Sequence, residues 1–139
     1  MPTGLIQKTL LDPVACPRMI CLYVDGYDAS KDDWYKDGDS PYLDWTDAYI
    51  FNPHLSLESG NYTFEDTAAT GTPTTTEVQL YCAGSTGTAT VYIYDGSSWV
   101  EAGTVDPSVF PTWKTIDVSA ILNTFTKINA AKMYIKYNP

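Results

Sequence analysis

The chain has 139 residues, with 17 acidic and 8 basic side chains and a formal net charge of −9. This length fits a single domain with a core of its own. The charge disfavours binding to phosphate backbones and to anionic lipid surfaces. No Lys or Arg lies between Asp37 and Trp113, so a basic footprint for nucleic acid is missing. We therefore expect neither a nucleic-acid nor a membrane partner.

The N-terminal residues 1–18 predict an extended arm, because prolines stand at positions 2, 13 and 17. Polar residues interrupt every apolar run, so we expect neither a secretory signal nor a membrane span here. A single domain is expected over residues 19–139. It begins with "MICLYV" (19–24), whose six successive apolar residues predict a strand buried on both faces.

The sequence contains three cysteines, Cys16, Cys21 and Cys82. Cys16 and Cys21 can form a disulfide or stay reduced. Cys82 shares the alternation of Val78 and Leu80, so we interpret it as a small hydrophobic residue of the core.

An acidic loop is predicted over residues 25–47, where eight of 23 residues are Asp. Carboxylate oxygens are the ligands that calcium prefers. The spacing differs from that of the D-x-D-x-D-G calcium loop, and two lysines lie among the acids, so a solvated acidic loop explains the segment as well. If calcium binds, Asp37 and Asp39 are the expected ligands; no other cofactor is expected.

The rest of the chain predicts short strands separated by turn residues. One helical turn is expected near 119–125. About eight strands at this spacing predict an all-β, antiparallel sandwich. After 19–24, the expected strands are 48–51, 62–65, 76–83, 88–94, 99–105, 113–118 and 130–137.

Several of these strands alternate strictly, which predicts one inward and one outward face. In 88–94, Val91 and Ile93 point inward and Tyr92 and Tyr94 outward. The same reasoning predicts an outward aromatic set, and places two lysines of the last strand where they protect a sheet edge. The aromatic set is open to three interpretations: a subunit interface, a platform for sugars, or the ordinary preference of strands for Tyr. Its members are Tyr81, Tyr92, Tyr94 and Tyr134, and the lysines are Lys132 and Lys136. Trp99, at the start of the next strand, is a further candidate for the same interface or ligand face.

The run from "VQLYCAGSTGTATVYIYDGSSWVEAGT" to "IDVSAILNTFTKINAAKMYIKY" resembles the jelly-roll sandwich domains of phage structural proteins and of extracellular carbohydrate-binding proteins. The shared pattern is a threonine-rich strand, a "DVS" turn, a short "ILNTF" helix and a final strand. The resemblance is mainly over residues 76–137 and implies a jelly-roll fold.

No catalytic motif is visible. The single histidine, His54, lies beside a proline, and no G-x-S-x-G is present. A pair of carboxylates for glycoside hydrolysis can come from distant parts of a fold, so sequence alone does not test that alternative. We expect a protein that is not an enzyme.

These features predict a non-enzymatic structural protein of a virus particle: a capsid decoration, head-fibre or tail-associated subunit. It would be made in the host cytoplasm and displayed on the virion surface, and it would contact other virion proteins and copies of itself as a homo-oligomer. Apolar arm residues would bind a neighbouring subunit, namely Leu5, Ile6, Leu10 and Leu11. The alternative is an extracellular module that binds glycans through the exposed aromatic residues.

Overall fold

The computed structural model describes residues 5–6, 20–28, 35–37, 49–51, 58–84, 86–110 and 112–139. Over these residues the protein is mostly β, with one short helix, α1 (Phe125–Ala130). The strands are β1 (Leu5–Ile6), β2 (Leu22–Asp28), β3 (Tyr35–Asp37), β4 (Tyr49–Phe51), β5 (Asn61–Phe64), β6 (Glu77–Cys82), β7 (Thr88–Tyr94), β8 (Trp99–Val105), β9 (Thr112–Asp117) and β10 (Lys132–Asn138).

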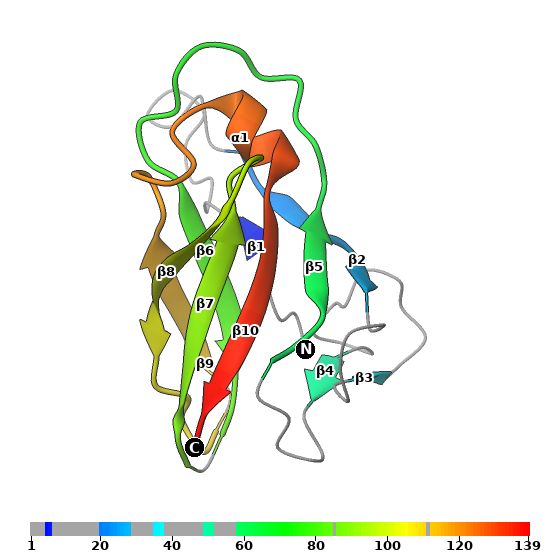
Figure 1. Cartoon of the computed structure of the whole chain (residues 1–139), viewed down its shortest axis with the longest axis vertical. Helices are drawn as coiled ribbons and strands as arrows, with labels where there is room; N and C mark the ends of the chain where they lie inside the picture. The colour runs from blue at the N-terminus through cyan, green and yellow to red at the C-terminus, as the bar shows by residue number, and fades with distance from the viewer. Residues whose placement is uncertain are drawn as a thin grey trace.

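The seven longest strands of the described part form two antiparallel sheets. Five of them, in the order β8-β7-β10-β5-β2, make the front sheet, and β6 and β9 make the back sheet (Figure 1). The two-residue strand β1 pairs with both β2 and β6 and so links the sheets along one side. Strands β3 and β4 form a separate pair. The all-β, antiparallel prediction is confirmed at this level.

The core lies between the two sheets and is formed by alternate residues of their strands. The buried apolar residues of β6, β7 and β10 are two apart in sequence, because successive side chains of a strand point to opposite faces. Gly103 of β8 faces Ile116 of β9 across the core, since a Cβ there would lie at an ordinary van der Waals distance of 3.4 Å from Cγ2 of Ile116. The most deeply buried side chains are Tyr62, Val78, Leu80, Val91, Ile93, Val118, Leu122 and Met133.

The first predicted strand differs from the expectation. Leu22 and Val24 are buried, but Tyr23 between them is 49% exposed. Strand β2 therefore buries one face, and the prediction of two buried faces was wrong. The strand also continues to Asp28, into the predicted acidic loop, because residues 24–28 pair with β5. Apolar composition alone does not show whether a second layer covers the other face of a strand.

The helical segment begins later than predicted. A turn forms first, in which the N–H groups of Ile121 and Leu122 donate to the carbonyl of Val118. The helix α1 follows it, capped by Thr124, whose hydroxyl accepts from the N–H of Lys127. A Thr at this position satisfies one of the free N–H groups of the first helical turn. The helix then buries Ile128 against the core.

The edge prediction for Lys132 and Lys136 was wrong, because β10 lies inside the front sheet, between β7 and β5. The strands at the two ends of the described order are β8 and β9. On β9, the half-buried Lys114 shares the core-facing parity of Ile116. In the β7–β8 pair, the register shifts between Val91 and Tyr92. An inward lysine and a bulge both discourage further strand pairing at an edge.

Several predictions fall outside the described residues: those on Cys16, His54, Asp39, Leu10 and Leu11. Leu5 and Ile6 of the predicted arm form β1, which pairs within the same chain. Cys82 packs against the core and is half-buried. Burial raises the pKa of its thiol, and nearby Lys114 opposes this shift.

Candidate functional site: an aromatic face

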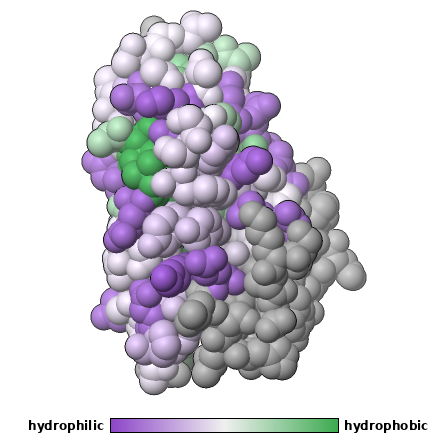
Figure 2. All heavy atoms as spheres, viewed as in Figure 1, coloured by the Kyte–Doolittle hydropathy of each residue, from purple (hydrophilic) through white to green (hydrophobic). Residues whose placement is uncertain are grey.

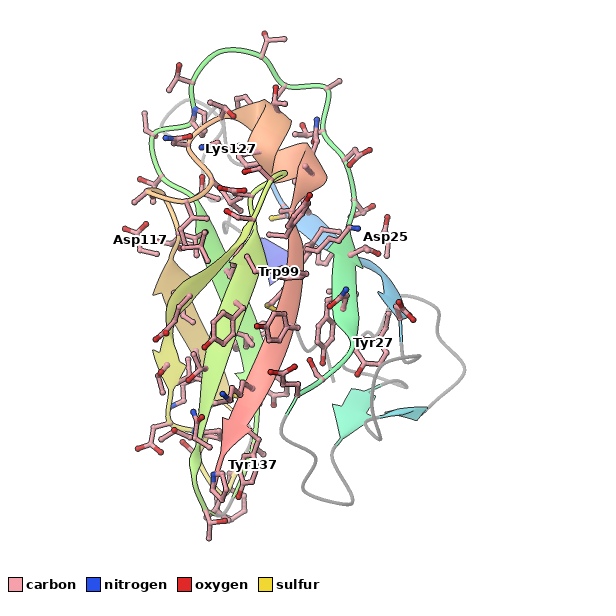
Figure 3. All side chains as sticks on the ribbon, viewed as in Figure 1. Asp25, Tyr27, Trp99, Asp117, Lys127 and Tyr137 are labelled. Carbon is pink, nitrogen blue, oxygen red and sulfur yellow. The ribbon has the colours of Figure 1, made fainter. Side chains whose placement is uncertain are left out.

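The outer side of the front sheet carries four aromatic residues from three adjacent strands. Tyr92 of β7 and Tyr134 of β10 are register partners. Their ring centroids are 4.7 Å apart and the rings are within 7° of parallel. Trp99 of β8 meets Tyr134 edge-on, with centroids 4.8 Å apart, and lies 5.5 Å from Tyr94. We call Tyr92, Tyr94, Trp99 and Tyr134 the front aromatic cluster; Figure 3 labels Trp99 over this sheet.

The turn between β7 and β8 brings Trp99 opposite Tyr94. One carboxylate oxygen of Asp95 accepts hydrogen bonds from the N–H groups of Ser97 and Ser98 and from the hydroxyl of Ser97. These bonds favour the ionised form and lower the pKa of Asp95 to about 2. Gly96 has a φ of 100°, a conformation that glycine adopts without strain. The "DGSS" turn therefore sets the register in which Tyr94 pairs with Trp99.

Charged groups surround the cluster. Nζ of Lys132 lies 5.7 Å from the ring centroid of Tyr94, within the range of a cation–π contact. Glu101 on β8 is the register partner of Tyr92. Burial raises the pKa of Tyr134, and the nearby Glu58 and Tyr92 raise it further. Figure 2, which views this side of the molecule, shows broad areas of intermediate hydropathy between strongly hydrophilic patches.

A polar cluster continues the same face below the aromatic one. Thr90, which shares the outward parity of Tyr92 and Tyr94 on β7, is only 7% exposed. Its hydroxyl lies 3.0 Å from that of Thr104 and accepts a hydrogen bond from the side-chain amide of Asn138. These contacts join β8, β7 and β10 on the same outer side as the front aromatic cluster.

The structure separates Tyr81 from the other predicted aromatic residues. Tyr81 lies on β6 in the back sheet, where its ring centroid is 5.1 Å from that of Trp113 on β9. Trp113 is 46% exposed. Tyr81 and Trp113, the back aromatic pair, therefore lie on the opposite outer face. Alternation predicted that Tyr81 points outward, but the sheet to which a strand belongs depends on long-range pairing.

Two further exposed apolar residues were not predicted. Val109 and Phe110, in the connection from β8 to β9, are 70% and 80% exposed. The preceding Ser108 accepts from the N–H of Gly84, which ties this connection to the end of β6. The segment shows no strand or helix periodicity, so only its two adjacent apolar residues in a turn-rich stretch could have indicated it.

No group of three or more potential metal ligands occurs among the described residues. Asp37 is the last residue of β3, and Asp39 lies outside the described part. The calcium site therefore stays a prediction. The described helix is too short to cross a membrane.

Comparisons with protein-family models, with curated proteins and with solved structures found no match for this chain.

Proposed function

We propose that this chain is a non-enzymatic structural subunit of a virus particle, displayed on the virion surface, that acts through contacts between subunits. The observation that carries the proposal is the front aromatic cluster, in which four aromatic side chains converge on an outer sheet face and Trp99 remains 36% exposed. Tyr and Trp are enriched in protein interfaces and dominate their energetics.

The way the rings pack supports a protein contact. Tyr92 and Tyr134 are nearly parallel at 4.7 Å, so each ring already occupies one face of the other. The edge of Trp99 adds a third ring to this group. Such self-packed rings form a fixed apolar surface, and little conformational entropy is lost when a partner covers it.

The edge strands of the sheets favour association through the sheet faces over association by strand pairing. Lys114 on β9 and the bulge opposite Val91 on β8 discourage strand addition at the two ends of the strand order. A subunit with protected edges and an aromatic face is suited to face-to-face association.

The proposal includes a jelly-roll arrangement of the sandwich, supported by repeated crossings of the chain between the two sheets, from β6 to β7 and from β8 to β9. The proposal also gives the predicted arm, residues 1–18, a role in assembly. Since Leu5 and Ile6 pair with β2 and β6 of the same chain, Leu10 and Leu11 are the better candidates for contact with a neighbour.

Light scattering over a dilution series tests the proposal. The wild-type protein should form concentration-dependent oligomers, and Trp99→Ala should weaken this association at least tenfold. The matched control is Phe110→Ala, which removes another exposed aromatic ring outside the cluster and should have little effect. A wild-type protein that stays monomeric at millimolar concentration would refute self-association.

A second candidate function is glycan binding by the same face. It is favoured by the position of Trp99 and Tyr94 beside Glu101 and Lys132, because aromatic rings flanked by hydrogen-bonding groups suit the apolar faces and hydroxyls of sugars. A glycan array discriminates between the two: binding that disappears in Trp99→Ala while the protein stays monomeric supports the glycan candidate.

A further inference from the structure

The connection from β5 to β6, residues 65–76, is a threonine-rich loop without helix or strand. Its sequence, EDTAATGTPTTT, holds six threonines, one glycine and one proline, and no charged residue follows Asp66 within it. Figure 1 shows it in green, passing over α1 at the end of the molecule opposite to the C-terminus. Segments rich in threonine and proline have the composition of chains that carry O-linked sugars.

Both ends of this loop are attached to the sandwich by hydrogen bonds. The side-chain amide of Asn129 on α1 accepts from the N–H of Thr67 and donates to its carbonyl. At the other end, Thr76 is 4% exposed, and its hydroxyl donates to the carbonyl of Leu122. The N–H of Thr76 donates to the hydroxyl of Ser119. The residues between these two attachments are therefore held away from the core.

The residues between the attachments are accessible. Thr70, Thr72, Thr74 and Thr75 are all exposed. Among the described residues, no hydrogen bond joins their hydroxyls, or the main chain of residues 70–75, to another group. Apart from its chain neighbours, no heavy atom lies within 4 Å of the place that a Cβ of Gly71 would take. The centre of the loop thus offers free hydroxyls on an unpaired main chain.

The main chain of the loop also suits an enzyme that acts on proteins. Such enzymes commonly bind the residues around their target as an extended strand. Pro73 disfavours the helical conformation at Thr72 and so favours an extended chain there. The backbone donors and acceptors of residues 70–75 are free to pair with the enzyme.

Threonines in regular structure provide a comparison within the same molecule. Thr115 and Thr126 are exposed, but Thr115 lies in the β6–β9 ladder and Thr126 in α1. The N-x-T sequon of Asn61 lies in β5, and the hydroxyl of its Thr63 donates to the carboxylate of Asp25. At these positions the main chain is already paired within the fold, so they are poorer acceptors than the loop.

We propose that Thr70, Thr72, Thr74 and Thr75 are acceptor sites for O-linked sugars, added by a separate glycosyl transferase. In the transfer, Oγ1 of a threonine forms a bond to the anomeric carbon of a nucleoside diphosphate sugar. The bond from that carbon to the phosphate oxygen breaks, the nucleoside diphosphate leaves, and the hydroxyl proton passes to a base of the transferase. This modification goes beyond the proposed role in assembly.

Charge favours a sugar over a phosphate at this loop. A phosphothreonine carries a charge of about −1.5 to −2 and is stabilised by neighbouring arginines. Glu65 and Asp66 precede the threonines and Glu77 follows them, and no Lys or Arg lies between Asp37 and Trp113. A phosphate would therefore be repelled by the acidic residues, whereas a neutral sugar adds no charge.

Mass spectrometry of the full chain, isolated from the cells or particles in which it is naturally made, tests the proposal. Cleavage after acidic residues releases residues 67–77 as one peptide. This peptide should carry hexose or N-acetylhexosamine units, and the peptides that contain Thr115 and Thr126 should carry none. The same chain produced in a host without a protein glycosyl transferase is the unmodified reference.

Variants locate the modified residues. The fourfold variant Thr70→Ala, Thr72→Ala, Thr74→Ala and Thr75→Ala should lose the sugar completely. All four side chains are exposed, so the variant is expected to fold, which circular dichroism checks. The matched control, Thr115→Ala with Thr126→Ala, also removes exposed threonines and should keep the full amount of sugar.

Limited proteolysis gives an independent measurement, because exposed loops of small residues are preferred sites of cleavage. Elastase, which cleaves after small apolar residues, should cut the unmodified reference after Ala68 or Ala69, and sugars on the neighbouring threonines should prevent this. Equal cleavage of the natural and reference chains would place the sugars elsewhere. An unmodified 67–77 peptide overturns the proposal, as does phosphate in place of sugar. Sugars on Asn61, Thr115 or Thr126 with none on the loop overturn it as well.

Discussion

Ser59 joins the segment before β5 to the centre of β10, and its replacement by alanine should destabilise the protein. The residue is only 4% exposed. Its hydroxyl accepts a hydrogen bond from the N–H of Ile135 at 2.8 Å and donates one to the carbonyl of Gly60 at 2.9 Å. The N–H of Ser59 in turn donates to the carbonyl of Ile135.

The expected loss in the free energy of unfolding follows from the polar groups that lose their hydrogen-bond partners. In Ser59→Ala, the N–H of Ile135 loses its acceptor in a buried position, and the carbonyl of Gly60 loses a donor. An unsatisfied buried polar group costs about 1–3 kcal/mol, so we expect the free energy of unfolding to fall by about 2 kcal/mol. For a chain of this size the melting temperature should drop by roughly 6–10 °C, between the values for smaller and larger domains.

Urea unfolding followed by circular dichroism measures this change, at a protein concentration low enough to keep the chain monomeric. Ser97→Ala is the control, because it also removes a hydroxyl that donates a hydrogen bond, but at an exposed turn. The control should change the free energy of unfolding by less than about 0.5 kcal/mol. A Ser59→Ala protein as stable as this control would show that the two hydrogen bonds of the Ser59 hydroxyl do not stabilise the fold.

Four other outcomes are expected. Leu122→Ala removes a fully buried side chain and should cost about 2–5 kcal/mol in urea unfolding. Gly87→Ala should cost more than about 1 kcal/mol, because φ is +74° and a Cβ would overlap the carbonyl oxygen of Asn138; wild-type stability would contradict this. Because the folded pKa of Asp95 is about 2, its contribution is complete above the unfolded pKa and is lost as the pH falls through about 2. The melting temperature of Asp95→Asn should therefore be lower than that of the wild type at pH 7, and the difference should shrink as the pH falls through about 2; a pH-independent difference would argue against this. Cys82, whose pKa burial raises, should react with iodoacetamide at pH 7 much more slowly than after unfolding, and equal rates would show that the thiol is accessible.

The strands between residues 76 and 105 were predicted to within one or two residues, because the period of two is a local property. Val91 and Ile93 are fully buried and Tyr92 and Tyr94 are outward, as alternation predicts. The first strand was harder, since the apolar run around Tyr23 contains no alternation that marks the exposed face. The one helical segment was predicted too early in the sequence, because the six residues of α1 bury one side chain, Ile128, which leaves no helical period to mark its bounds.

The sequence predicted the residues of the front aromatic cluster, but it did not predict which of the candidate aromatic residues lie together. Tyr92, Tyr94, Trp99 and Tyr134 meet because β10 inserts beside β7, a pairing between residues about 40 positions apart. The same long-range pairing places Tyr81 in the other sheet, beside Trp113. It also moved Lys132 and Lys136 from an expected edge to the centre of the front sheet.

For the strands whose sequence alternates, β6, β7 and β10, the sequence alone indicates which side chains point to the core, since alternate residues of an extended chain point to opposite faces whatever lies beside them. It also determined the turn at Asp95, whose side-chain hydrogen bonds reach only two and three residues along the chain. Tertiary structure alone decided which strands are neighbours and hence which outward residues form one surface. Strand order depends on how two sheets together bury the inward side chains, and no local pattern contains that information.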